Sequence, residues 1–297
     1  MVDSYVTPTN KLVVRGEPAR IIKKNLGVVT NGYPGRLAVR EATDYDVKVA
    51  DGLLPPLGWI GYEQQAIQYQ TGSISTINVV DTEVPIISGG GFSIYMPSGL
   101  ALGTVATEGD LLFPWTGGQV VPGVALGGRY ALKVPFTNTS GTTLVDTGID
   151  IPGGVLIRDV MLNVTTAGAS GAELDVGFKN ATEGGDLDGL LDGESCATAG
   201  LVNHVMSSAS AADNTLGVLL VEDDITSADT TPLLTSIPTG YVTDGTITSL
   251  VYTPTNHAMA GDIYVFIESP GFKPVGRAGK TVSAASAAAG IFVETLI

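Results

Sequence analysis

A single cysteine, Cys196, stands in this chain of 297 residues, so no disulfide can form within one chain. Disulfide-rich scaffolds are excluded, and we expect the protein to mature in a reducing compartment or to be stabilised by its core alone. Cys196 is expected to be buried and chemically inert. No apolar run approaches the ~18 residues of a membrane-spanning helix, and the first residues lack the hydrophobic centre of a secretory signal. These absences predict synthesis in a cytoplasm.

Charged residues are also scarce, and positive ones are the scarcer. They make up 15% of the chain, against about 25% in a typical soluble domain. Fifteen Lys and Arg stand against 30 Asp and Glu, which gives a formal net charge of −15 and a pI of about 4.3. Such a surface repels phosphate, so nucleic-acid binding is disfavoured. The two histidines, His204 and His257, are too few for the usual His-rich catalytic zinc centre.

Glycine and short apolar runs are plentiful by contrast. The chain has 39 glycines and 16 prolines and is 44% apolar, which argues against disorder. Between Val84 and Gly123, short apolar runs alternate with turn clusters such as Gly89–Gly91 and Thr116–Gly118. This pattern is typical of a tight barrel or folded sheet. We predict an all-β protein that begins with a small β-barrel or β-tulip-like domain.

The second half shows longer strands with a period of two. In Glu173–Lys179, Leu174, Val176 and Phe178 point inward, and Val155–Val164 alternates in the same way. Asp262–Glu268 is apolar on both faces, so we expect it at the centre of a sheet. These patterns predict an antiparallel β-sandwich of jelly-roll type. Its other expected strands are Leu201–Met206, Leu216–Val221 and Thr246–Tyr252.

The length of the chain favours two domains. The polar segment Phe136–Thr143 marks the expected boundary. We therefore expect an N-terminal arm at 1–26, a β-barrel domain at 27–135, a β-sandwich at 136–272 and a C-terminal tail at 273–297. In the tail, Ser283–Ala289 is rich enough in alanine for one or two helical turns, and Ile291–Val293 is a strand-like apolar tip.

One dense carboxylate cluster is the weak candidate for a metal site. It consists of Asp186, Asp188, Asp192 and Glu194. Calcium takes six to eight oxygen ligands, and this loop could supply some of them. The EF-hand spacing fails, because Leu190 and Leu191 stand where a ligand and the obligatory glycine belong. A solvated acidic turn is the simpler interpretation.

Other motifs lack the partners that their chemistry requires. Ala278–Thr281 resembles the end of a phosphate-binding loop, but Pro274 replaces the first glycine of that pattern. Ser195 lacks the second glycine of a nucleophile elbow. We therefore expect no catalytic residue, no cofactor and no enzymatic activity.

Two further groups of residues have a structural and a functional interpretation. Trp59 and Trp115 could form a sugar-stacking platform, but packing inside the protein is favoured, since both have apolar neighbours. N-x-S/T triplets begin at Asn138, Asn163 and Asn180. Without an export signal these triplets are expected to be accidents of composition.

Several segments resemble the head decoration, or cement, proteins of tailed phages. In the N-terminal half they are Asn31–Leu37, Pro56–Tyr62, Ser88–Phe92, Glu108–Leu112 and Gly117–Val121. Later segments resemble an outward-facing β-sandwich of phage structural proteins, namely Asp146–Asp150, Asp159–Thr166 and Asp186–Gly193. The resemblance implies a bacteriophage virion protein on the capsid surface, a homotrimer whose partners are the major capsid protein lattice and its own copies. Neither nucleic acid nor membrane is an expected partner.

The basic residues gather at the N-terminal end. No Lys or Arg occurs from Ala50 to Gly128, and only Arg158 and Lys179 are basic between Phe136 and Phe272. We hypothesise that the basic segment docks on an acidic capsid surface and adds a strand through Leu12–Val14 or Ile21–Ile22. The expected partner-contact residues are Lys11, Leu12, Val13, Val14, Arg15, Arg20, Ile21, Ile22, Lys23 and Lys24. The alternative is a carbohydrate- or receptor-binding module of a viral fibre or tail, which predicts exposed aromatic residues on the sandwich.

Overall fold

A computed structural model describes residues 12–18, 20–27, 32–41, 46–61, 83–180, 187–202, 241–243, 248–283 and 289–297. Within these ranges the protein is all-β, as predicted, with one short 3-10 helix, η2 (Thr116–Gly118). No helix in the described ranges is long and apolar enough to cross a membrane. The strands of the first half are β1 (Val13–Arg15), β2 (Arg20–Leu26), β3 (Leu37–Arg40), β4 (Asp46–Val49), β5 (Gly58–Ile60), β6 (Glu83–Ser88), β7 (Ser93–Leu100), β8 (Val105–Ala106), β9 (Leu111–Pro114) and β10 (Val120–Leu126). Those that follow are β11 (Arg129–Asn138), β12 (Val145–Ile151), β13 (Leu156–Thr166), β14 (Glu173–Asn180), β15 (Leu191–Ser195), β16 (Gly200–Val202), β17 (Tyr241–Val242), β18 (Thr248–Pro254), β19 (Met259–Glu268), β20 (Gly276–Ala278), β21 (Val282–Ser283) and β22 (Ala289–Thr295).

The chain forms two compact units, and the second is inserted into the sequence of the first. Unit 1 comprises Met1–Ala125 and Ser269–Ile297, and unit 2 comprises Leu126–Glu268. The expected boundary at residues 135 and 136 lies inside β11, so the division comes earlier than the polar segment suggests. Residues 1–26 and 273–297 also differ from expectation, because their described parts supply strands to the sheets of unit 1.

A closed barrel of five strands forms one part of unit 1, in the order β2-β4-β3-β5-β6. Only β2 and β4 are parallel among its neighbours. Three of its strands, β3, β5 and β6, are buried on both faces. In β5 and β6, Ile60 and Ile86 fill the barrel interior, while Trp59 and Ile87 pack into a second core cluster. The Ile86-Ile87 pair, which breaks the alternation of a half-exposed strand, is explained by this double burial.

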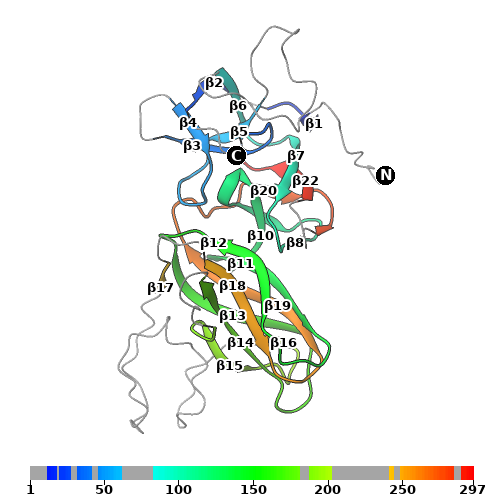
Figure 1. Ribbon diagram of the computed structural model, residues 1–297. Helices are drawn as coiled ribbons and strands as arrows, with labels where there is room; N and C mark the ends of the chain where they lie inside the picture. The colour runs from blue at the N-terminus through cyan, green and yellow to red at the C-terminus, as the bar shows by residue number, and fades with distance from the viewer. Residues whose placement is uncertain are drawn as a thin grey trace. The chain divides into compact units, whose positions relative to one another are not determined.

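The second sheet of unit 1 includes the end of the described chain. Its order is β1-β7-β22-β20-β9-β10, and β10 also pairs with β7 through Val120 and Leu100, so the sheet returns on itself. Figure 1 shows β22 in red between β7 and β20. Ile291, Phe292 and Val293 are all buried. The C-terminal segment is therefore a central strand and not a tail, because its apolar residues fill the core of its own unit.

Unit 2 is a β-sandwich of two antiparallel sheets. One has the order β11-β19-β13-β16, with β17 also paired to β13, and the other has the order β12-β18-β14-β15. If the described strands of unit 2 are numbered one to eight along the chain, leaving out β17, the order in the first sheet is one, eight, three, six. The order in the second sheet is two, seven, four, five. This strand order is that of a jelly roll, as predicted.

The predicted alternation of buried and exposed residues is confirmed in β14, and the predicted central position of β19 is confirmed as well. Leu174, Val176 and Phe178 of β14 are buried, whereas Glu173 and Lys179 are exposed. β19 lies between β11 and β13, as expected for a strand that is apolar on both faces. Leu216–Val221 and most of Leu201–Met206 and of the alanine-rich run lie outside the described residues.

Candidate functional site

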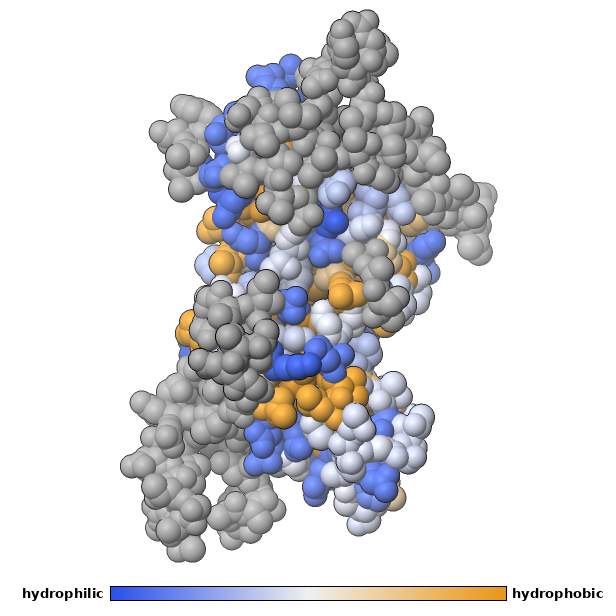
Figure 2. Space-filling view, viewed as in Figure 1, coloured by the Kyte–Doolittle hydropathy of each residue, from blue (hydrophilic) through white to orange (hydrophobic). Residues whose placement is uncertain are grey.

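The outward side of β2 carries exposed residues from the predicted contact segment. Arg20, Ile21 and Lys23 are exposed, Ile21 with 58% of its surface accessible, while Ile22 packs toward the barrel interior. Ile21 and Lys23 alternate with Ile22 and so point away from the barrel interior, whereas Arg20 lies on the side of Ile22 and is exposed at the start of the strand. We call these three exposed residues, Arg20, Ile21 and Lys23, the β2 face. In Figure 2, hydrophilic atoms cover the area where Figure 1 places β2 and β4.

The earlier half of the predicted contact segment is built into unit 1. Val13 pairs with Ile94 of β7, and the amide of Tyr95 donates to the carbonyl oxygen of Leu12 at 2.9 Å. Leu12 is 4% exposed and belongs to the core. The expected N-terminal arm at 1–26 is therefore not separate from unit 1 in its described parts, residues 12–18 and 20–26. β1 lies at the end of its sheet, and its outer edge pairs with no other described strand. A strand of a binding partner could therefore still pair with this edge.

The remaining predicted contact residues differ in their surroundings. Arg15 and Lys24 already have interaction partners within the chain, so they are not part of the β2 face. Val14 is half-buried. Lys11 lies outside the described residues.

The two units differ strongly in charge. Unit 1 contains 11 Lys and Arg against 12 Asp and Glu, and unit 2 contains 4 against 18. Their formal charges are therefore −1 and −14, so unit 2 carries nearly all of the net charge of −15. Within unit 1, residues 12–27 hold four cations and one anion, Glu17. This segment is locally cationic in a unit that is nearly neutral.

The acidic residues of β14 and β15 do not assemble the predicted cluster. Burial raises the pKa of Asp175, a hydrogen bond of 2.8 Å from the Gly193 amide opposes that rise, and the charges of Asp192 and Asp188 add to it. Glu194, however, lies opposite Leu174 in the sheet register and is 6% exposed, whereas Asp192 is exposed.

The candidate metal site therefore loses one of its members. Glu194 is buried with an apolar residue and so does not join Asp192 in a common ligand set. Asp186 lies outside the described residues. In the described ranges, no group of three or more His, Cys, Asp or Glu side chains is arranged to hold a metal ion.

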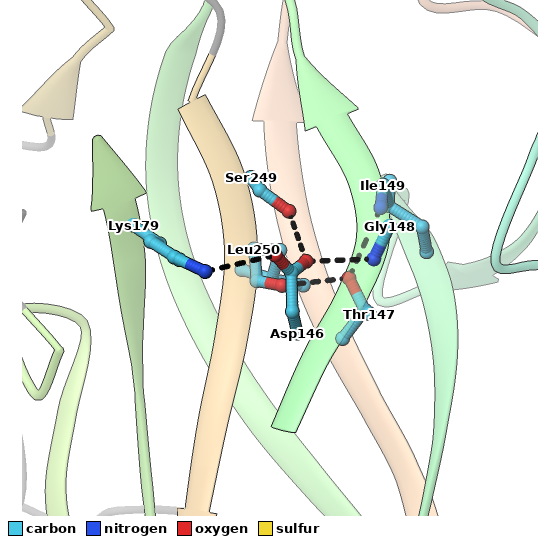
Figure 3. Close-up of polar contacts among 7 residues, drawn as sticks. All are labelled: Asp146, Thr147, Gly148, Ile149, Lys179, Ser249 and Leu250. Carbon is cyan, nitrogen blue, oxygen red and sulfur yellow. Dashed lines mark hydrogen bonds and ion pairs between the residues drawn. The ribbon is translucent and has the colours of Figure 1, made fainter. Parts of the chain in front are cut away.

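A polar cluster that the sequence analysis did not single out lies on the second sheet of unit 2 (Figure 3). Asp146 of β12 accepts hydrogen bonds from the hydroxyl of Ser249 and, at 2.9 Å, from the Gly148 amide. Lys179 of β14 places its Nζ 3.7 Å from the other carboxylate oxygen. Burial alone would raise the pKa of Asp146, but these hydrogen bonds and the lysine charge lower it.

This cluster joins three neighbouring strands at an irregularity. The register of β12 against β18 shifts between Asp146 and Asp150, and Gly148 takes a φ of 71° there. Thr147 fixes the same bulge by donating to the carbonyl oxygen of Leu250 at 2.7 Å. A serine nucleophile needs a neighbouring base, such as a histidine or a lysine, that can take its proton. Here the Ser249 hydroxyl donates to Asp146, Lys179 is paired with the same carboxylate, and His257, the histidine of the described ranges, lies in the connection between β18 and β19. We therefore assign the cluster a structural role.

We compared the chain with protein-family models, curated proteins and solved structures. No match was found. The functional argument therefore rests on the residues of this chain.

Both tryptophans and Asn138, which had two interpretations, make contacts within the protein. Trp59 and Trp115 are 0% and 3% exposed, so they pack in the core and offer no sugar-stacking platform. The Asn138 side-chain amide donates to the carbonyl oxygens of Gly141, Thr255 and His257, which leaves no free amide for a glycan. Among the described aromatic residues of unit 2, none is exposed.

The remaining sequence motifs lie in structural positions. Ala278 ends β20 and is followed by β21, where a phosphate-binding loop would require a helix. The Nζ atom of Lys280 lies 5.4 Å from the centre of the Phe292 ring. Cys196 is buried as expected, and burial raises the pKa of its thiol to about 12.

One residue with unusual surroundings escaped the sequence analysis. Arg36 is 6% exposed and lies directly before β3. In the sequence it follows the turn Tyr33-Pro34-Gly35 and resembles any other surface cation of the basic N-terminal end. Its burial depends on the barrel closing around it, which no local pattern reveals.

Proposed function

We propose that this chain is a structural, non-enzymatic virion protein that binds the assembled capsid lattice of a tailed phage and stabilises it. The observation that carries the proposal is the unequal charge of the two units, −1 against −14, together with the exposed cations of the β2 face. Unit 1 provides the contact surface, and the acidic jelly roll of unit 2 faces water. The resemblance of the glycine-rich segments to decoration proteins supports the same function.

The β2 face combines the two kinds of contact that a docking surface needs. Arg20 and Lys23 supply charge that speeds encounter with an acidic surface. Ile21 supplies apolar area: burying its exposed 58% contributes ~1 kcal/mol, or about fivefold in affinity. The strand is held in a closed barrel, so little conformational entropy is lost when it binds.

Stabilisation of the lattice follows from mass action. A protein that binds only the assembled shell lowers the free energy of that shell by RT ln(1 + L/Kd) for each site, where L is the concentration of free protein. A homotrimer, as the resemblance implies, strengthens modest contacts through avidity. The charge of −14 on unit 2 keeps decorated particles apart through electrostatic repulsion.

A binding assay on undecorated shells tests the proposal. Purified protein is mixed with shells and the bound fraction is measured by sedimentation at ~0.05 M and ~0.2 M salt, since screening weakens charge contacts over this range. We expect binding by the natural chain, a loss of tenfold or more in Arg20→Glu/Lys23→Glu, and a smaller loss in Ile21→Ser. The matched control is Arg40→Glu/Lys273→Glu, which changes the net charge equally at two exposed positions of unit 1.

Two outcomes contradict the proposal in different ways. If the natural chain does not bind shells at either salt concentration, the function itself is refuted. If the natural chain binds but both double variants bind equally well, the docking surface is refuted. The second candidate, a glycan-binding module, gains no support from the described aromatic residues of unit 2.

A further inference from the structure

Arg36 is held in place by its backbone. Its amide donates to the carbonyl oxygen of Tyr33 at 3.2 Å, and its own carbonyl oxygen accepts from the Ile60 amide at 2.8 Å. The Gly35 amide donates to the Ile60 carbonyl oxygen at 2.6 Å, and Gly118 packs close to the Arg36 Cβ position. These contacts tie the residue to β5 and η2.

Within the part of the chain that the structure describes, the buried donors of the guanidinium have no acceptor. Nε and Nη1 are both buried and have no hydrogen-bond partner. The guanidinium carbon lies 5.9 Å from the centre of the Tyr33 ring. The ion pairs found within the described ranges join other residues, for example Lys48 with Asp51 at 2.9 Å. Buried arginines in proteins are normally paired and hydrogen-bonded, so this arrangement is unusual.

An uncharged residue would fill the same space at lower cost. Burial lowers the pKa of Arg36 to about 10, so the group is still protonated at neutral pH. A buried charge without a partner is strongly unfavourable, whereas a methionine or leucine of similar volume packs without this penalty. A cation at this position is therefore best explained by a partner that the charge attracts.

We propose that Arg36 is the anchor of an oxyanion site in unit 1, where its buried N–H groups bind a carboxylate or phosphate. A guanidinium is suited to this chemistry, because its planar donors match the oxygens of both groups. The oxyanion has two sources: a free anion, or an acidic side chain of a second copy, whose unit 2 carries 18 Asp and Glu. Arg36 itself lies in unit 1, and the proposed site does not depend on the proposed capsid function.

Thermal unfolding of the full chain separates these sources. The natural chain is melted in buffers of equal ionic strength containing sodium chloride, sodium acetate or inorganic phosphate, and at protein concentrations over a 100-fold range. A free-anion site predicts a rise in Tm of about 5 °C at saturating acetate or phosphate over chloride. A site filled by a second copy predicts a Tm that rises with protein concentration in chloride alone, with a matching change in sedimentation.

Variants connect the effect to the residue. Arg36→Gln removes the charge and is expected to abolish both dependences, while Arg40→Gln, at the exposed end of the same strand, keeps them. Should Arg36→Gln fail to fold, the natural chain still provides the test. In a spectrum of arginine side-chain N–H groups, one Nε–H protected from exchange must shift on addition of phosphate, or on raising the protein concentration. A Tm that ignores both anions and protein concentration, no shifted Nε–H signal, or Arg36→Gln responding like the natural chain would each overturn the proposal.

Discussion

Replacing Phe292 by alanine tests whether the C-terminal strand is a structural member of unit 1. Phe292 is 1% exposed, and its ring lies 4.9 Å from that of Tyr95, opposite which it pairs in β7. The Gly279 amide donates to its carbonyl oxygen at 2.8 Å, and this bond survives the substitution. Removing a buried phenylalanine ring costs about 3–5 kcal/mol from lost transfer energy and the cavity that remains.

The chain contains two natural probes, one for each unit. Both tryptophans, Trp59 and Trp115, belong to unit 1, so their fluorescence reports its unfolding. Cys196 is the single thiol, is buried in unit 2, and reacts with a thiol reagent only when that unit opens. With a urea m-value of ~2 kcal/mol/M, the fluorescence midpoint of Phe292→Ala should fall by about 2 M. The urea concentration at which Cys196 becomes reactive should not change.

The control is Leu296→Ala, four residues later, where 53% of the side chain is exposed. Its backbone amide still donates to the Val275 carbonyl oxygen, so only side-chain contacts are removed. We expect a change within ~0.5 kcal/mol. If Phe292→Ala shifts the fluorescence midpoint no more than this control, the strand does not stabilise unit 1 and our reasoning fails.

Three further predictions concern single contacts. Asp146→Asn should cost about 0.5–1 kcal/mol at pH 7, a figure kept small because the side chain is 42% exposed. The lowered pKa of Asp146 stabilises the fold at pH values above the usual carboxyl range. This stabilisation is lost as the pH falls through the lowered pKa of the folded state, so the Tm profiles of the two proteins should converge at pH values below it. Asp175→Asn should instead raise the stability at pH 7 by about 0.5 kcal/mol, because the raised pKa of Asp175 means that its ionised form destabilises the fold. This destabilisation disappears when the carboxyl group is protonated at low pH. An unchanged or lower Tm of the variant at pH 7 would contradict the prediction. Gly118→Ala should cost about 2 kcal/mol or more by tryptophan fluorescence, since φ is +66° and a Cβ would lie 2.7 Å from Val49 Cγ1. Gly109→Ala, with φ +88° and open space around it, measures the backbone strain alone, and equal losses would exclude the packing clash.

Local patterns predicted the sandwich well, because one face of each strand meets the core and the other meets water. The alternation of β14 and the double-sided apolar character of β19 both depend on this rule. Together with the turn clusters they were enough to predict a jelly roll. The bulge at Asp146 was not predictable, since it depends on how Ser249, about 100 residues away in sequence, approaches the carboxylate.

Long-range pairing explains most of what the sequence analysis missed in unit 1. Residues 20–26 look like a basic arm because their cations dominate the composition, but Ile22 and Leu26 face the interior of a closed barrel. Ile291–Val293 was recognised as a strand, yet its position between β7 and β20 depends on partners up to 200 residues earlier. The burial of Arg36 follows from the same closure of the barrel.

The interruption of unit 1 by unit 2 sets an order of events on the ribosome. Strands β20 and β22 emerge only after Leu126–Glu268 has been translated, which at 5–20 residues per second delays them by about 10–30 s. The jelly roll, whose sequence is continuous, is then free to form first, while the earlier strands of unit 1 wait for their neighbours. In a nascent chain, all of unit 2 is therefore available for folding before β22 can complete the second sheet of unit 1. Unit 1, which carries the proposed contact surface, can be completed only late in synthesis.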